Sequence, residues 1–222
     1  MPEMERMADF FDRRAEEYDV HMLDELGLEP FYAEIGDLTP GGKGLRVLDL
    51  GCGTGLELER LLKKNPDAAV TAVDISGGLL DRLQRRLGEG RNRLTLVQAS
   101  YWEMPLPAEA YDLVLSTYSL HHASPSEKLT LYRRIYETLA KGGRFLYGDY
   151  VLPDYAQEEE ARREGERIRK AHGLRSLREV HVDIPLSMET ERDLLRRAGF
   201  PRVTTAWEGV NAAIFVADKA AL

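Results

Sequence analysis

The stretch VLDLGCGTG at residues 47–55 decides the fold. An apolar strand here runs into a glycine-rich turn, and leucine-rich helical sequence follows from Leu56. Glycines in such a turn let the backbone approach a ligand closely and adopt conformations that a Cβ forbids. The unpaired N–H groups at the start of the next helix attract a carboxylate or phosphate. The stretch therefore predicts a strand–turn–helix unit that binds a nucleotide-like ligand.

A dinucleotide is one alternative for that ligand. The first two glycines of the turn fit the dinucleotide-binding pattern, but that pattern needs Gly or Ala at its sixth position, where this chain has Leu56. The third glycine, Gly55, comes one residue early. Asp49 adds an anionic side chain where a pyrophosphate would lie, and where the ammonium of a methionine moiety would be favoured. These features favour an adenosyl ligand with a methionine part.

Short apolar runs alternate with helical patterns along the middle of the chain. Strands are expected at Leu45–Leu50, Ala69–Ile75, Leu94–Gln98, Tyr111–Ser116 and Gly143–Val151. Leucines recur at helical spacing between them, and the pair Gly142–Gly143 is expected to stop the helix before the fifth strand. Because the runs show little alternation, they are typical of strands buried on both faces. The pattern predicts an α/β fold with a doubly wound, mostly parallel sheet.

The end of the chain has a different pattern. Glu189–Ala198 is predicted to form a helix closed by Gly199. Two extended runs follow, Val203–Trp207 and Ala212–Ala217, joined by the short link Glu208–Asn211. We expect an antiparallel hairpin at the edge of the sheet.

We expect one domain over residues 1–222, with a cofactor-binding core at 45–151 and the C-terminal helix and hairpin at 187–222. Two segments lie outside this core: an N-terminal pair of helices within residues 1–40, and an inserted, charge-rich segment at 152–186. The N-terminal helices are predicted at about Met4–Asp19 and Pro30–Leu38. Apolar side chains recur at spacings of three and four in the first of them, so that face must cover something. Both segments are therefore predicted to act as lids over the strand ends.

Composition limits the class of protein. Lys and Arg total 30 against 38 Asp and Glu, a net charge of −8, so the chain lacks a general electrostatic footprint for nucleic acid, although a local basic patch stays open. No stretch approaches the roughly 18 consecutive apolar residues that span a bilayer. The single cysteine, Cys52, fits a reducing compartment. We expect a cytoplasmic monomer or homodimer without membrane contact.

The second strand is expected to end near Asp74, which lies 23 residues after Gly51. An acidic residue at about this distance can accept both ribose hydroxyls and would repel a 2′-phosphate. The alternative is that Asp74 caps the helix that starts at Ser76–Gly77. The glycine turn and Asp74 together are more specific than either feature alone.

With these motifs the chain resembles the class I S-adenosylmethionine-dependent methyltransferases, a family with a seven-stranded, Rossmann-like sheet. The resemblance rests on residues 47–55, Asp74, the strand Tyr111–Ser116 and the turn Gly142–Gly143. It implies that the last strand is antiparallel, which agrees with the predicted hairpin. It also implies that S-adenosyl-L-methionine is the cofactor and that the reaction is a methylation.

The resemblance implies roles for particular residues. The loop Gly51–Gly55 would hold the methionine part, Asp74 the ribose, and Ile75 one face of the adenine. The family often has an acidic residue at the position of Ser100, so here Ser100 or Tyr101 would read the adenine amino group. The expected cofactor-binding residues are Asp49, Gly51, Cys52, Gly53, Gly55, Asp74, Ile75, Ser100, Tyr101 and Ser116.

The fourth strand ends in the sequence STYSLHH at residues 116–122. Ligands of open α/β sheets lie beyond the carboxyl ends of the strands, so His121 and His122 are candidate bases for a hydroxyl or amine acceptor. Two alternatives stay open: positioning alone can suffice for a direct displacement, and one of the histidines can simply cap a helix or bond a carbonyl. The expected acceptor pocket is lined by Phe11, Tyr18, Tyr118 and Tyr150.

No metal site is predicted, and the charge-rich insert is read as a solvated helix. Four histidines and Asp149 could converge, but none of them has the H-E-x-x-H or cysteine-rich spacing of a metal motif. The histidines in question are His121, His122, His172 and His181. In the insert, pairs at i,i+4 such as Glu158 with Arg162 are expected, with an RNA-facing surface as the alternative.

The function that these features favour is methyl transfer from S-adenosylmethionine to a small-molecule acceptor by direct displacement. The insert followed by residues 187–200 faintly resembles enzymes related to carboxy-S-adenosylmethionine synthase. A tRNA-modification-related enzyme that uses S-adenosylmethionine or a carboxylated derivative is therefore one alternative. A nucleotide-binding oxidoreductase and a catalytically inactive binding module are the others.

Overall fold

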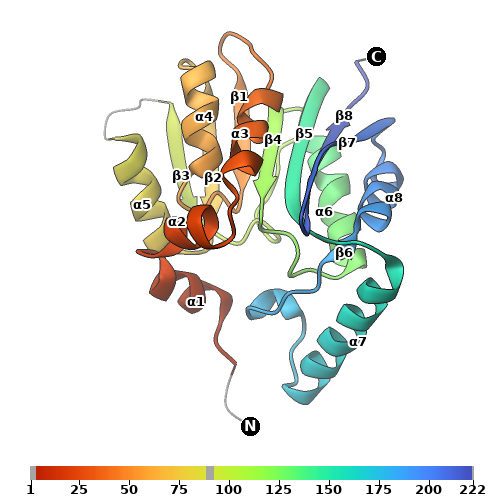
Figure 1. The fold of residues 1–222 in the computed structure, drawn as a ribbon. Helices are drawn as coiled ribbons and strands as arrows, with labels where there is room; N and C mark the ends of the chain where they lie inside the picture. The colour runs from red at the N-terminus through yellow and green to blue at the C-terminus, as the bar shows by residue number, and fades with distance from the viewer. Residues whose placement is uncertain (1–3, 89–92, 222) are drawn as a thin grey trace.

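The computed structural model describes residues 4–88 and 93–221. One central sheet has the strand order β3-β2-β1-β4-β5-β8-β7, and helices cover both of its faces (Figure 1). The strands are β1 (Arg46–Leu50), β2 (Ala69–Asp74), β3 (Leu94–Gln98), β4 (Tyr111–Thr117), β5 (Leu139–Leu152), β7 (Arg202–Gly209) and β8 (Ala212–Asp218). The strands β1 to β5 run parallel, whereas β8 is antiparallel to both β5 and β7. The predicted seven-stranded sheet with a C-terminal antiparallel hairpin is confirmed; the two-residue strand β6 (Leu186–Ser187) adds a short pairing with β5.

Helices divide the core into two layers. They are α1 (Met7–Arg14), α2 (Tyr18–Val20), a π-helix (His21–Glu25), α3 (Glu29–Leu38), α4 (Leu56–Lys64), α5 (Gly77–Leu87), α6 (Pro125–Thr138), α7 (Tyr155–Ala171), a 3-10 helix (Leu177–Glu179) and α8 (Met188–Ala198). One face of the sheet packs against α3, α4 and α5, and the other packs against α6 and α8. None of the helices in the described ranges has the length and apolar character needed to cross a membrane.

The boundary between α6 and β5 differs from the prediction. The helix ends at Thr138, before the expected stop at Gly142–Gly143, and β5 begins at Leu139. Leu139 is fully buried and pairs with Tyr111 of β4, and a register shift follows in that ladder. Burial of this leucine in the sheet therefore ends the helix one turn early.

The predicted helix Met4–Asp19 is also wrong as a single element. α1 ends at Arg14, and a turn separates it from α2. The break lets two acidic side chains dock at different places. Asp12 accepts hydrogen bonds from Ser76 Oγ (2.6 Å) and Gly78 N (2.9 Å) at the start of α5, and Asp19 accepts one from Thr54 Oγ1 (2.5 Å). The N-terminal segment is thereby fixed to the glycine turn and to α5.

The charge-rich helix α7 does not make the expected pair between Glu158 and Arg162. Glu158 is buried, and it accepts hydrogen bonds from the backbone N (2.8 Å) and Oγ (2.7 Å) of Ser187. Arg162 instead pairs with Glu159 at i,i+3. Glu158 lies on the face of α7 that meets β6, so it bonds Ser187 and does not join the ion pairs on the solvated face of the helix.

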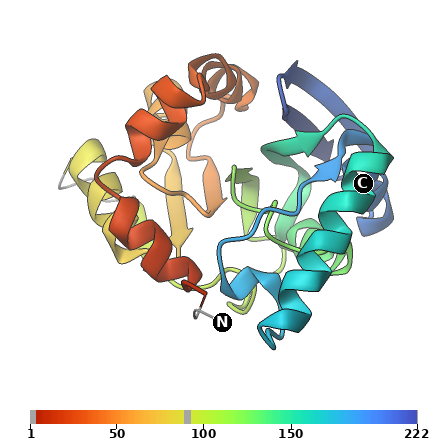
Figure 2. The same cartoon turned by 60° about the horizontal axis from the view of Figure 1, so that its bottom comes forward.

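In Figure 2, α1 and α7 stand on either side of the same end of the sheet.

A buried ion pair joins α6 to α8, and it generates the first prediction. Lys128 and Glu191 contact each other with fully buried side chains. Glu191→Ala leaves the Lys128 ammonium buried without a counter-charge, so we expect the free energy of unfolding to fall by about 3–5 kcal/mol in urea denaturation. Asp193→Ala, which breaks an exposed pair with Arg197, should cost at most about 1 kcal/mol. Equal losses for the two variants would contradict this account.

Candidate active site

The three glycines of the turn after β1 have backbone conformations that favour glycine, and at Gly51 a Cβ would have no room. Gly51, Gly53 and Gly55 have φ angles of +74°, +51° and +77°. A Cβ on Gly51 would lie 1.9 Å from Oγ of Ser119, and one on Gly53 would lie 3.5 Å from the ring of Tyr18. The backbone N–H groups of Gly51 and Cys52 donate to the carbonyl of Val73, which fixes the turn to β2. The turn thus brings its backbone against the end of β4 on one side and against α2 on the other.

Asp74 lies at the end of β2 with its side chain turned into the glycine turn. Its carboxylate accepts hydrogen bonds from the backbone N of Gly53 (2.9 Å) and Ser76 (2.9 Å). Ser76 itself caps α5, accepting from Leu79 N at 3.0 Å, so the alternative role of Asp74 as the cap is wrong. Burial raises the pKa of Asp74 to about 6. Each carboxylate oxygen has a second lone pair, which is what two ribose hydroxyls need.

Asp49 forms a buried carboxyl pair with Glu57 in the first turn of α4. Asp49 is fully buried, and among the described residues neither of its carboxylate oxygens has a hydrogen-bond partner. Burial, reinforced by the negative charge of Glu57, raises the pKa of Asp49 well above its usual range. Orphaned acceptors beside a glycine turn fit the ammonium of a methionine moiety, because a buried acceptor without a donor is costly.

The remaining residues expected to bind the cofactor differ in burial and in their hydrogen bonds. Ile75 and Ser100 are half-buried. The Tyr101 hydroxyl donates to the Ser119 carbonyl at 2.9 Å, which directs Tyr101 toward the glycine turn and leaves Ser100 as the candidate for the adenine edge. Ser116 is fully buried and donates to the carbonyl of Leu50 at 2.8 Å, so its hydroxyl ties β4 to β1.

A sharp change of direction follows β4. Tyr118 has a φ of +46°, a conformation that is uncommon outside glycine and often marks functional sites. Beyond it, Nδ1 of His121 lies 2.6 Å from Oδ1 of Asp149, a fully buried residue of β5. Asp149 is held in turn by Leu120 N (2.9 Å) and by the hydroxyl of Tyr147 (3.0 Å). The His121 ring therefore has a fixed orientation.

Three histidines and one acid meet at this point; they are His121, His122, His181 and Asp183, called here the histidine cluster. Oδ1 of Asp183 lies 3.2 Å from Nδ1 of His122, 3.6 Å from Nε2 of His121 and 3.9 Å from Nε2 of His181. Burial lowers the pKa of His122 and lowers that of His181 to about 4. Burial opposes the charge on His121 too, but Asp149 outweighs it and raises the pKa.

Aromatic side chains surround the histidine cluster. Phe10 of α1 stacks on His181 with ring centroids 3.6 Å apart. The four residues expected to line the acceptor pocket are all half-buried: Phe11, Tyr18, Tyr118 and Tyr150. Phe11 lies 6.4 Å from His122 and 6.2 Å from Tyr18, while Tyr118 and Tyr150 lie 6.2 and 6.1 Å from His121, all between ring centroids. The structure thus brings Phe11, Tyr118 and Tyr150 to the two histidines and places Tyr18 beside Phe11.

Several residues of this site were missed from the sequence. Asp183 of the insert was not considered, whereas His181 was considered together with His172, which lies instead at the end of α7. The pattern His181-Val182-Asp183 was a usable signal, because residues two apart in an extended segment face the same side. Asp12 carried no such signal, because its partners on α5 are more than 60 positions away.

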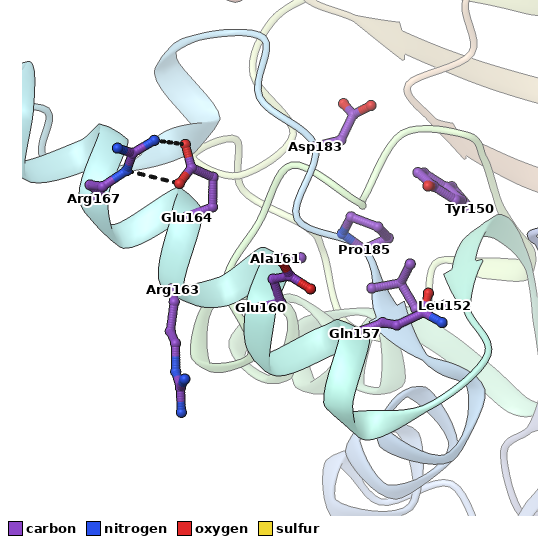
Figure 3. Close-up of a pocket in the computed structure, with 10 residues that line it drawn as sticks. All are labelled: Tyr150, Leu152, Gln157, Glu160, Ala161, Arg163, Glu164, Arg167, Asp183 and Pro185. Atoms are coloured by element: carbon purple, nitrogen blue, oxygen red, sulfur yellow. Dashed lines mark hydrogen bonds and ion pairs between the residues drawn. The ribbon is translucent and has the colours of Figure 1, made fainter.

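An open groove of about 770 Å³ adjoins the histidine cluster through Tyr150 and Asp183 (Figure 3). Its other walls are the charged face of α7 and the apolar side chains of Leu152 and Pro185. The lining residues of α7 are Gln157, Glu160, Ala161, Arg163, Glu164 and Arg167. Glu164 and Arg167 pair with each other, so the charges on this wall are partly neutralised.

Comparisons with known proteins agree with this geometry. A family model described as "Methyltransferase domain" matches residues 47–143. The chain is 27% identical to an uncharacterized methyltransferase of Geobacillus thermodenitrificans, over 78% of this chain and 75% of that protein. It is 26% identical to carboxy-S-adenosyl-L-methionine synthase of Wolinella succinogenes, over 98% of this chain and 95% of that one.

A solved structure supports the fold as well. Human N-acetylserotonin methyltransferase in complex with S-adenosylmethionine superposes with a TM-score of 0.60 at 20% identity, over 96% of this chain and 55% of that one. This chain therefore spans about half the length of that enzyme. At this identity the likeness concerns the fold alone. Together with the match of the methyltransferase-domain model to residues 47–143, it supports the resemblance of the chain to the class I S-adenosylmethionine-dependent methyltransferases, with S-adenosylmethionine as cosubstrate.

The glycine turn generates the second prediction. Gly51→Ala introduces a Cβ that would lie 1.9 Å from Oγ of Ser119, at a φ of +74°, so the turn must move. We expect calorimetry with S-adenosylhomocysteine to show at least about tenfold weaker binding, since one strained non-glycine residue costs of order 1–3 kcal/mol. Gly42→Ala is the matched control, because its Cβ would meet only Leu45 at 3.9 Å. Unchanged affinity for Gly51→Ala would move the ligand away from this turn.

Proposed function

We propose that this methyltransferase acts on a small-molecule acceptor held at the histidine cluster. The observation that carries the proposal is the enclosure of that cluster. Phe10 and Phe11 cover it from α1, and residues 180–185 cover it from the insert, with a backbone bridge between Arg6 and Val180 joining the two segments. A site covered on two sides limits the access of water and favours a compact acceptor.

The residues expected to hold S-adenosylmethionine lie next to that enclosed site. Ser119 connects them, since it touches the glycine turn and lies two residues before His121. In the proposal, Asp49 with Glu57 receives the ammonium, the backbone of Gly51–Gly55 receives the carboxylate, and Asp74 receives the ribose. Ile75 and Ser100 contact the adenine.

S-adenosylmethionine supplies an electrophilic methyl group, which the acceptor takes by direct displacement. The chain's part is to align the acceptor and to act on its nucleophilic atom. His121 is suited to this, because the carboxylate of Asp149 lies 2.6 Å from its Nδ1 and fixes the ring, so that Nε2 is the nitrogen left to act on the acceptor. The fixed orientation of that ring, set by Asp149, makes His121 the first candidate catalytic residue and His122 the second.

A second candidate function is use of a carboxylated form of the cosubstrate. It is favoured by the match to a carboxy-S-adenosyl-L-methionine synthase along nearly the whole chain. The wall of α7 carries both acidic and basic residues, which gives no clear preference for an RNA partner.

The test is a screen of amine, hydroxyl, thiol and carbon acceptors with S-adenosylmethionine labelled in its methyl group. Label on a small acceptor supports the proposal. Label only on tRNA from methylation-deficient cells would favour the alternative. Tight binding of NAD without any adenosyl ligand, measured by calorimetry, would replace both with an oxidoreductase.

Asp74 gives the third prediction. Loss of its carboxylate leaves two ribose hydroxyls without a charged acceptor, so Asp74→Ala should weaken S-adenosylhomocysteine binding by roughly 1.5–3 kcal/mol in calorimetry. Because the pKa of Asp74 is about 6 and the ionised form accepts both hydroxyls, affinity should rise as the pH rises through that value and level off above it. Asp74→Asn should remove this pH dependence. Asp81→Ala, on the exposed side of α5, serves as the control.

The N-terminal segment gives the fourth prediction. Phe10–Tyr18 covers the histidine cluster and the glycine turn, so ligand entry requires it to move. We expect hydrogen exchange of this segment to slow when S-adenosylhomocysteine binds, while α3, which packs against α4 and β5, stays unchanged. Equally strong protection with and without ligand would make the segment a permanent part of the core.

A further inference from the structure

We propose that the histidine cluster binds one divalent transition-metal ion through His121, His122 and Asp183. One potential ligand atom from each residue lies within 4.8 Å of the others. Metal binding stands on this geometry alone; the role of the ion in holding an acceptor rests on the proposed function, and in the metal-bound site the ion takes the place of Nε2 of His121 as the group that acts on the acceptor.

The spacing of the ligand atoms fits a common ion. Oδ1 of Asp183 lies 3.6 Å from Nε2 of His121 and 3.2 Å from Nδ1 of His122. Two ligands at about 2.0–2.2 Å from a tetrahedral zinc-like ion are separated by about 3.3–3.6 Å. The separation from His121 is longer than a normal hydrogen bond, so this contact satisfies neither group. An ion placed between the three residues would satisfy both.

The surroundings of His121 match those of a metal-bound histidine. Such histidines almost always direct their second ring N–H to a carboxylate or a carbonyl, which fixes the ring and leaves the other nitrogen as the ligand. Nδ1 of His121 has the Asp149 carboxylate at 2.6 Å, and Asp149 is itself anchored by Leu120 N and the Tyr147 hydroxyl. His122 shares its Nδ1 proton with the carbonyl of Val182 (3.1 Å) and with Asp183, and the ion would replace that proton.

The donor set selects the kind of ion. Two imidazoles and one carboxylate suit zinc, iron, cobalt or nickel, whereas magnesium and calcium prefer oxygen ligands throughout. Three protein ligands leave at least one position open, as in catalytic rather than structural sites. The Asp183 side chain is 42% exposed, so the open position is accessible, and His181 flanks it under the stacked ring of Phe10. An acceptor with an oxygen or nitrogen donor can bind there next to the transferred methyl group.

The experiment uses the full chain without a purification tag, treated with a chelator and titrated with Co²⁺. We expect one ion per chain with the visible absorption bands of four- or five-coordinate cobalt, and loss of these bands when Zn²⁺ displaces it. His122→Ala and Asp183→Ala should each weaken Co²⁺ binding by at least about tenfold, and Asp149→Asn by about 10–100-fold through the His121 ring. His172→Ala, at the half-buried C-cap of α7, should leave binding unchanged.

Binding of S-adenosylhomocysteine by each variant reports whether the fold is intact. The proposal is overturned if intact wild-type protein shows no such bands, or if His122→Ala and Asp183→Ala bind Co²⁺ as tightly as the wild type. These outcomes are separate from the proposed function. Methyl transfer at full rate by the chelated protein would show that the ion has no part in catalysis, and the proposed small-molecule acceptor would stand. Cobalt binding without methyl transfer to any acceptor would support the metal site and contradict the proposed function.

Discussion

The buried carboxylate of Asp149 is the interaction on which the site depends. It sits in the middle of the sheet, where an unpaired charge would be very costly, and its oxygens are used by His121, Leu120 N, Tyr150 N and Tyr147. Tyr147 also contacts Lys128 and Glu191, so the segment after β4 that carries His121 is connected to the ion pair between α6 and α8. One hydrogen-bond network thus fixes the orientation of the His121 ring and holds α6 and α8 to β5.

The fold could be predicted because its signals are local. Apolar runs without alternation, the glycine turn after Leu50 and the C-terminal hairpin each follow from a few neighbouring residues. The errors occurred where distant contacts override local pattern. Leu139 joins β5 because its side chain is buried beside Tyr111, and Glu158 leaves the solvated face of α7 because Ser187 offers it two donors. Neither contact is visible from spacing along the chain.

The candidate site divides in the same way. Asp49, Asp74 and the glycines could be named in advance because they share a strand–turn–helix unit and its neighbouring strand. His121 and His122 could be named because strand ends gather ligands. Asp149 precedes α7 in the chain and Asp183 follows it. Only the fold places the two carboxylates beside the rings of His121 and His122. The chemistry of the histidines, and with it the case for a metal ion, therefore became apparent only in three dimensions.

The central claim is that the histidine cluster faces the reactive end of the cosubstrate. The most direct measurement is an isotope-edited NOE experiment on the chain bound to S-adenosylmethionine that carries ¹³C in its transferable methyl group, without an acceptor. The account predicts NOEs from that methyl group to ring protons of Tyr118, His121 or His122. NOEs to side chains of α7 with none to residues 118–122 would contradict it.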